Sequence, residues 1–79
     1  MWLMSIEYAV VLRWDEDYQG YWVDVPSLPG CVSQGKTREA AIKNVVEAIY
    51  LYLEGLIEDG REIPQENEEG ATVEVVLAE

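Results

Sequence analysis

The chain has 79 residues, 49% of them hydrophobic, which is enough for one small domain, residues 1–79, with a single core. The 16 Asp and Glu residues against 5 Lys and Arg give a formal charge of −11, which repels phosphate backbones. Direct nucleic-acid binding is therefore not expected, whereas a basic protein would be attracted. The charge also has a plainer explanation, because it keeps a small protein soluble.

Cysteine and histidine usage narrows the possibilities further. A single cysteine excludes an internal disulfide, and the absence of histidine excludes a Ser-His-Asp triad and a thiolate–imidazole metal site. We therefore expect no metal, no cofactor and a reducing, cytoplasmic setting. Residues 1–4 are apolar but include no basic residue, and this apolar stretch is too short for a signal peptide or a membrane span to be expected.

Three strands are predicted in the first half of the chain. Apolar side chains alternate along residues 6–13, and both faces are partly apolar, which indicates a central strand. One face carries Ile6, Tyr8, Val10 and Leu12, and the other carries Glu7, Ala9, Val11 and Arg13. A polar turn follows, in which Gly20 can take a positive φ, and residues 21–25 complete a hairpin. Pro26 and Pro29 end that strand because they lack N–H groups, so residues 31–34 form a short third strand.

One helix and a last strand are predicted in the second half. Thr37 suits the N-cap with Glu39 in the first turn, and Gly60 suits the position after the helix end. Between them, apolar residues recur every three or four positions at Ile42, Val45, Val46, Ile49, Leu53, Leu56 and Ile57. An acidic loop at residues 65–70 then leads to a valine-rich strand at 72–77.

These elements predict an α+β fold of order β-β-β-α-β. A right-handed connection through the helix would place the last strand parallel to the first, giving an antiparallel meander plus a fourth strand in spatial order 3-2-1-4. The helix would cover one face of the sheet and leave Ala9, Val11 and Trp22 on the other. This uncovered face, together with the outward-facing Leu51, favours self-association as a homo-dimer or homo-tetramer, or binding of another protein.

The segment from Gly20 to Thr37 resembles the core motif of HicB-like antitoxins. It contains a Gly-Tyr strand, a Pro-x-Leu-Pro-Gly-Cys turn and a Gly-x-Thr helix start, and Glu39-Ala40-Ala41 and Ile63-Pro64 extend the similarity over roughly residues 6–77. The resemblance implies a degraded ribonuclease H-like fold and a non-catalytic protein that covers the active site of a small basic, mRNA-cleaving, HicA-like toxin. Many members carry a C-terminal DNA-binding segment; this sequence ends at Glu79, directly after the last strand, so DNA binding and autoregulation are not expected.

The residues expected to bind a partner combine negative charge with exposed apolar bulk. Trp22 is the best candidate for a buried anchor, since tryptophan and tyrosine dominate interface energetics. An acidic cluster at the first hairpin could contact a basic partner, although a solvated turn explains the same residues. The full set is Asp15, Glu16, Asp17, Trp22, Asp24 and Leu51.

The sequence gives less support to a catalytic function than to partner binding. A metal nuclease needs several converging carboxylates, and Glu7 and Asp24 are the only acids within the first two strands, while the helix acids point elsewhere. Cys31 lacks a histidine base and is expected to be a small packing residue. We therefore expect no enzyme. An orphan homo-oligomeric regulatory domain without a toxin remains the alternative function.

Overall fold

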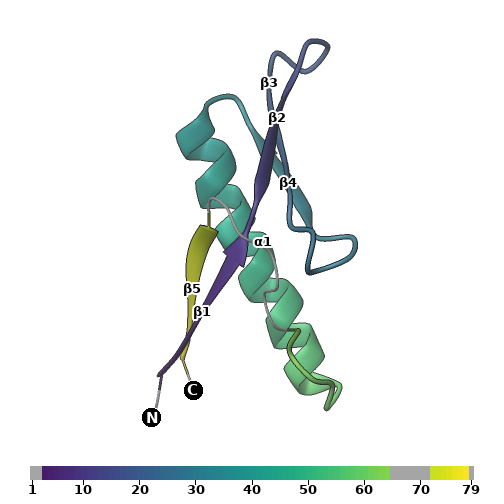
Figure 1. The fold of residues 1–79 in the computed structure, drawn as a ribbon, viewed down its shortest axis with the longest axis vertical. Helices are drawn as coiled ribbons and strands as arrows, with labels where there is room; N and C mark the ends of the chain where they lie inside the picture. Colours follow the sequence, from purple (N-terminus) through teal and green to yellow (C-terminus); the bar gives the residue numbers. More distant parts are fainter. Residues whose placement is uncertain (1–2, 65–71, 79) are drawn as a thin grey trace.

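The computed structural model describes residues 3–64 and 72–78, and the side chains of residues 6–64. It is an α+β fold, as predicted, and the predicted acidic loop at 65–70 lies outside the described residues. An antiparallel three-stranded sheet, a two-stranded ribbon and one helix make up the fold (Figure 1). The elements are β1 (Leu3–Ala9), β2 (Val11–Asp15), β3 (Gly20–Asp24), β4 (Val32–Gly35), α1 (Arg38–Glu58) and β5 (Thr72–Ala78).

The predicted first strand is divided at Val10 into β1 and β2. The β2 segment pairs with β3, and the β1 segment pairs with β5, so the strand has two partners along its length. Its predicted inward face is confirmed at Tyr8 and Val10, which are buried. Ala9 was expected on the uncovered face and is buried instead. Ala9 is part of β1, which pairs with β5, so it does not lie on the uncovered face of the three-stranded sheet.

The prediction of a parallel last strand is wrong. β5 pairs antiparallel to β1, with Leu3 opposite Ala78 and Ala9 opposite Thr72, and the two form a ribbon of their own rather than a 3-2-1-4 sheet. The sequence pattern did not show at which end of the first strand the last strand begins. The Tyr8 hydroxyl donates a hydrogen bond of 2.6 Å to the Pro64 carbonyl, so the chain after the helix lies beside the C-terminal end of β1, and β5 begins opposite Ala9 and runs back along β1.

Both predicted helix ends are confirmed. The Thr37 hydroxyl accepts a hydrogen bond of 3.0 Å from the Ala40 N–H and caps the N-terminus. At the other end Gly60 has φ +71°, and its N–H donates to the Ile57 carbonyl over 3.1 Å. The Arg61 N–H donates to the Leu56 carbonyl over 2.9 Å. These two bonds form a Schellman motif, which explains why a glycine ends the helix.

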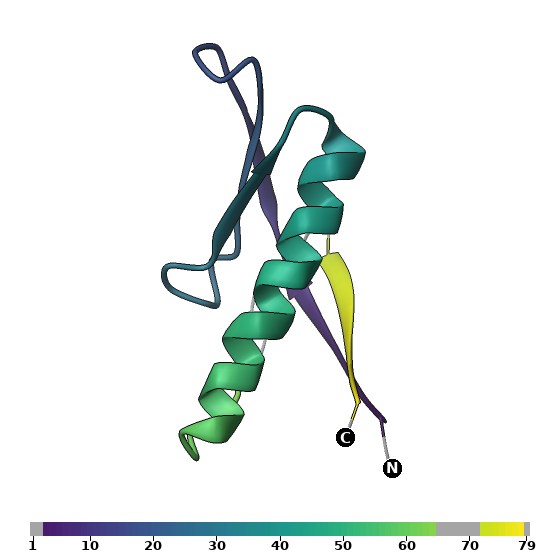
Figure 2. The ribbon, with the colours of Figure 1, turned by 180° about the vertical axis from the view of Figure 1, so that it is seen from behind.

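The core lies between α1 and one face of the sheet (Figure 2). The helix contributes Ala41, Val45, Ile49 and Leu53, which pack against Tyr8, Val10, Val23, Val25, Leu28 and Cys31. Ile57 was predicted to continue this stripe but is 42% exposed. Each four-residue step rotates about 40° around the helix, so the row that starts at Ala41 has turned away from the sheet by Ile57.

The β2–β3 turn differs from the prediction at one residue. Gln19, not Gly20, has the positive φ, at 57°, and its N–H donates to the Asp15 carbonyl over 2.8 Å. Gly20 is required for a different reason. A Cβ there would lie 2.8 Å from the Gly35 carbonyl oxygen and 2.8 Å from the Tyr18 ring.

Candidate binding surfaces

The sheet face turned away from α1 carries exposed apolar side chains. The register places Val11, Asp24 and Val32 in one cross-strand row, and Arg13, Trp22 and Gln34 in the next. We call these six residues the open face. Val11, Trp22 and Val32 are 39%, 37% and 47% exposed, so an apolar patch with Trp22 in it faces solvent.

The open face has balanced charge. Arg13 Nη2 lies 2.9 Å from Asp24 Oδ2, across the β2–β3 pair. Both side chains are solvent-accessible, so this ion pair adds less than about 1 kcal/mol to stability, and its main effect is to neutralise the face. An open pocket of about 320 Å³ is lined by Arg13, Trp14, Asp15, Trp22 and Asp24. The structure thus brings together three predicted residues, Asp15, Trp22 and Asp24, and adds Arg13 and Trp14, which were not predicted as site residues.

Two carboxylates at the acidic hairpin tip accept hydrogen bonds from within the hairpin. Asp15 Oδ1 accepts from the Tyr18 N–H over 2.9 Å, and Glu16 Oε2 accepts from the Trp14 indole N–H over 2.6 Å. Asp17 is exposed and, among the described residues, has no such partner. Two of the three predicted carboxylates therefore stabilise the turn, and Asp17 is the outward charge.

Lys36, which precedes α1, contacts the tip of the β2–β3 hairpin. Lys36 Nζ donates to the Tyr18 carbonyl and lies 3.8 Å from the centroid of the Tyr18 ring. That ring is 6.3 Å from the ring of Trp22. Lys36 thus fixes the Tyr18 ring, and the Tyr18 ring in turn packs beside Trp22 on the open face. Sequence reasoning missed this contact because Lys36 and Tyr18 are distant in the chain and no local pattern links them.

Leu51 belongs to a different surface. It is 58% exposed on the side of α1 that faces away from the sheet, whereas Trp22 projects from the sheet face that α1 does not cover. The two residues therefore lie on opposite sides of the molecule. The predicted partner-binding set divides into the open face with the adjacent hairpin tip, and the outer side of the helix.

The groups considered for chemistry do not form a reactive site. Cys31 is 4% exposed within the core, as predicted for a packing residue, and burial raises the pKa of its thiol. Glu7 lies on β1, and Asp24 is paired with Arg13 on β3. Within the described part of the chain, no three or more His, Cys, Asp or Glu side chains are placed to hold a metal ion.

Because its thiol is buried and protonated, Cys31 should react slowly in the folded protein. We expect modification by a disulfide reagent at pH 8 to be at least about 100-fold slower than in the urea-unfolded chain, since only the thiolate attacks. The raised folded pKa also means that this thiol favours the folded state below pH 9.0, its ordinary pKa, and that the contribution is lost as pH rises through the folded value. Equal labelling rates with and without urea would contradict the burial.

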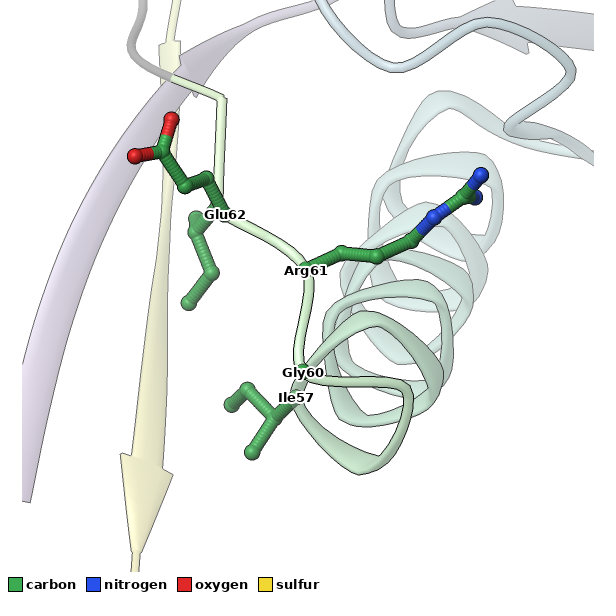
Figure 3. Close-up of a pocket in the computed structure, with 5 residues that line it drawn as sticks. Ile57, Gly60, Arg61 and Glu62 are labelled. Carbon is green, nitrogen blue, oxygen red and sulfur yellow. The ribbon is translucent and has the colours of Figure 1, made fainter.

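A hollow of about 720 Å³ lies at the end of α1 and is lined by Ile57, Gly60, Arg61, Glu62 and Ile63. Figure 3 shows that the Arg61 guanidinium and the Glu62 carboxylate point away from each other. Polar groups therefore do not converge on a ligand there. No helix among the described residues is long and apolar enough to cross a membrane.

The described residues thus form a small α+β domain whose distinctive features are exposed surfaces rather than a catalytic cleft. A sequence model of the HicB-like antitoxin of bacterial toxin–antitoxin systems matches residues 8–76. The chain belongs to the HicB-like antitoxin family, and the antitoxin is the non-enzymatic component of such a system.

Individual relatives agree with this assignment. A UPF0150 protein of Thermoplasma acidophilum is 46% identical over 69 residues, which cover 86% of this chain and 97% of the relative. Antitoxin HicB 1 of Photorhabdus laumondii is 34% identical over 62 residues, covering 78% of this chain and 39% of the antitoxin. The crystal structure of the N-terminal domain of Burkholderia pseudomallei antitoxin HicB superposes with a TM-score of 0.68 at 28% identity, covering 95% of this chain and 96% of that domain.

Proposed function

We propose that the chain neutralises a small basic, mRNA-cleaving toxin of the HicA-like type by binding it and blocking access of RNA, without turnover. The observation that carries the proposal is uncompensated negative charge: the chain has a formal charge of −11, and Asp24 is the one carboxylate in the described part that is ion-paired. Such a surface attracts a basic protein and speeds its encounter, while apolar contacts set the lifetime of the complex.

We further propose that the open face joins copies of this chain into a homo-dimer or homo-tetramer. Two chains of charge −11 repel each other, and the open face, where Arg13 neutralises Asp24, is the place where apolar area is available with least local repulsion. The same face supports the alternative function, an orphan homo-oligomeric regulatory domain without a toxin. A single cysteine with no disulfide suits a cytoplasmic location.

Co-expression with the product of the adjacent reading frame tests the toxin proposal, which requires that this product is a small basic protein. We expect the two proteins to co-purify and the mixture to lose the mRNA cleavage that the basic protein shows alone. Because encounter is electrostatic, raising salt should slow association more than it speeds dissociation. Undiminished mRNA cleavage at excess antitoxin, with a homo-oligomer still present, would instead support the orphan domain.

Replacing Trp22 by alanine tests the open face. We expect the dissociation constant of the homo-oligomer to rise about 30-fold, equivalent to about 2 kcal/mol for a central tryptophan. Sedimentation velocity over a concentration series measures this change. Ile57→Ala is the control, because Ile57 is a large apolar residue that is 42% exposed but lies in the last turn of α1, away from the open face. Equal effects of the two substitutions would contradict the proposal.

A further inference from the structure

We infer that the outer side of α1 around Leu51 and Gly55 is the surface on which the basic toxin docks; this inference rests on the function proposed above. The surface consists of Glu47, Leu51, Glu54, Gly55 and Glu58, which we call the outer face. All five residues are exposed. At 100° per residue they lie opposite the buried row of Val45, Ile49 and Leu53, so the sheet does not contact them.

Gly55 has no explanation within the fold. It lies in the helix interior and is not among the glycines of positive φ. A Cβ at this position would meet nothing within 4 Å. Glycine destabilises a helix interior relative to alanine, so the isolated chain would be more stable with a side chain here. Gly35, by contrast, is required by a close approach of two backbones.

Binding of a partner protein would explain why a glycine occupies position 55. Gly55 leaves a bare stretch of backbone one turn after Leu51, whose side chain is 58% exposed. A second protein can approach the helix closely at the glycine and bury the leucine beside it. Glycine serves this purpose wherever another backbone or ligand must come close. The two residues together place bare backbone beside an exposed apolar side chain.

The charge around Leu51 and Gly55 identifies the occupant as basic. Glu47, Glu54 and Glu58 lie on the same side of the helix, and the last turn of α1 contains no basic residue. Glu58 and Asp59 lie at the helix C-terminus, where the helix dipole is already negative, so they destabilise the isolated chain and would be stabilised by a bound cation. A second copy of this chain would place the same carboxylates against one another. Charge complementarity therefore selects the basic toxin rather than a second antitoxin.

Gly55→Gln tests the inference, because it should improve folding and impair docking at once. Glutamine is a better helix former, and we expect the thermal midpoint to rise by about 3 °C. Its side chain covers the bare backbone at position 55, so we expect the dissociation constant for the adjacent-frame basic protein to rise at least tenfold, measured by isothermal titration calorimetry. The oligomeric state should not change. A more stable variant that binds less tightly cannot be explained by loss of folding.

A pair of charge variants provides the second measurement. Glu54→Gln and Glu39→Gln each remove one carboxylate from an exposed helical position, and the two sites lie roughly 22 Å apart along the axis at about 1.5 Å per residue. We expect Glu54→Gln to weaken binding several-fold and Glu39→Gln to leave it within twofold.

The outcomes are distinguishable. If the wild-type chain does not bind the basic protein, the proposed function fails. If the wild type binds and Gly55→Gln binds equally well with a raised thermal midpoint, the proposed function stands and the outer face is overturned as the docking surface. If Gly55→Gln disrupts the homo-oligomer and leaves toxin binding unchanged, a second copy occupies the outer face, and the inference is likewise overturned.

Discussion

Gly35→Ala is expected to lower the free energy of unfolding by about 3 kcal/mol or more, out of a total on the order of 5 to 10 kcal/mol for a domain of this size. Gly35 is the last residue of β4, and a Cβ there would lie 2.4 Å from the Ala41 nitrogen and 2.6 Å from the Ala40 carbonyl carbon. Both atoms belong to the backbone of the first helical turn, which cannot move aside as a flexible side chain can. The clash is relieved only if β4 separates from α1, which opens the core beside Ala41.

Urea unfolding monitored by circular dichroism measures the effect. Gly30→Ala is the comparison, because Gly30 has φ +83° but a Cβ there would meet nothing within 4 Å. That variant carries only the backbone cost of a left-handed residue, about 1 kcal/mol. We therefore expect a clearly lower midpoint for Gly35→Ala than for Gly30→Ala. The reverse order would show that β4 and α1 are not packed as closely as the structure has them.

Leu28→Ala is expected to cost about 3 kcal/mol, in the range for large-to-small changes at fully buried sites. Leu28 lies in the bend between Pro26 and Pro29, yet its side chain is 0% exposed. The bend is held by hydrogen bonds from the Leu28 N–H to the Val25 carbonyl, 3.0 Å, and from the Cys31 N–H to the Leu28 carbonyl, 2.9 Å. With the bend fixed in this way, the core cannot collapse to fill the space that the leucine leaves.

The Pro-x-Leu-Pro-Gly-Cys turn therefore has a structural role: its leucine and its cysteine both enter the core. Val32→Ala, four residues further along, is the matched control, since Val32 is 47% exposed on the open face. We expect it to cost less than about 1 kcal/mol. Similar losses of thermal midpoint for the two variants would contradict the different burial of Leu28 and Val32.

Features with local causes could be predicted from the sequence. Thr37 and Gly60 mark the helix ends because a hydroxyl satisfies a free N–H and a glycine adopts a positive φ. Alternation identified the inward face at Tyr8 and Val10. The direction of β5 could not be predicted, because it depends on the path of the connection after the helix. Hydrophobic periodicity carries no information about that path.

The candidate surfaces were predicted in part. Trp22 and Leu51 were both identified as exposed from their positions in a strand and a helix, but they were grouped as one set although they lie on opposite sides. Arg13 follows from the same alternation as Trp22, and only the register shows that it reaches Asp24. Gly55 was overlooked because its significance lies in the empty space around it, which a sequence does not display.

The ribbon of β1 and β5 has a consequence for the order of folding. It pairs Leu3 with Ala78, so forming it closes a loop of nearly the whole chain, and the entropy lost in loop closure grows with loop length. The hairpin of β2 and β3, then β4 and the helix, are joined by contacts between segments close in sequence, which form sooner. We therefore expect the two ends of the chain to meet last during folding and to separate first during partial opening.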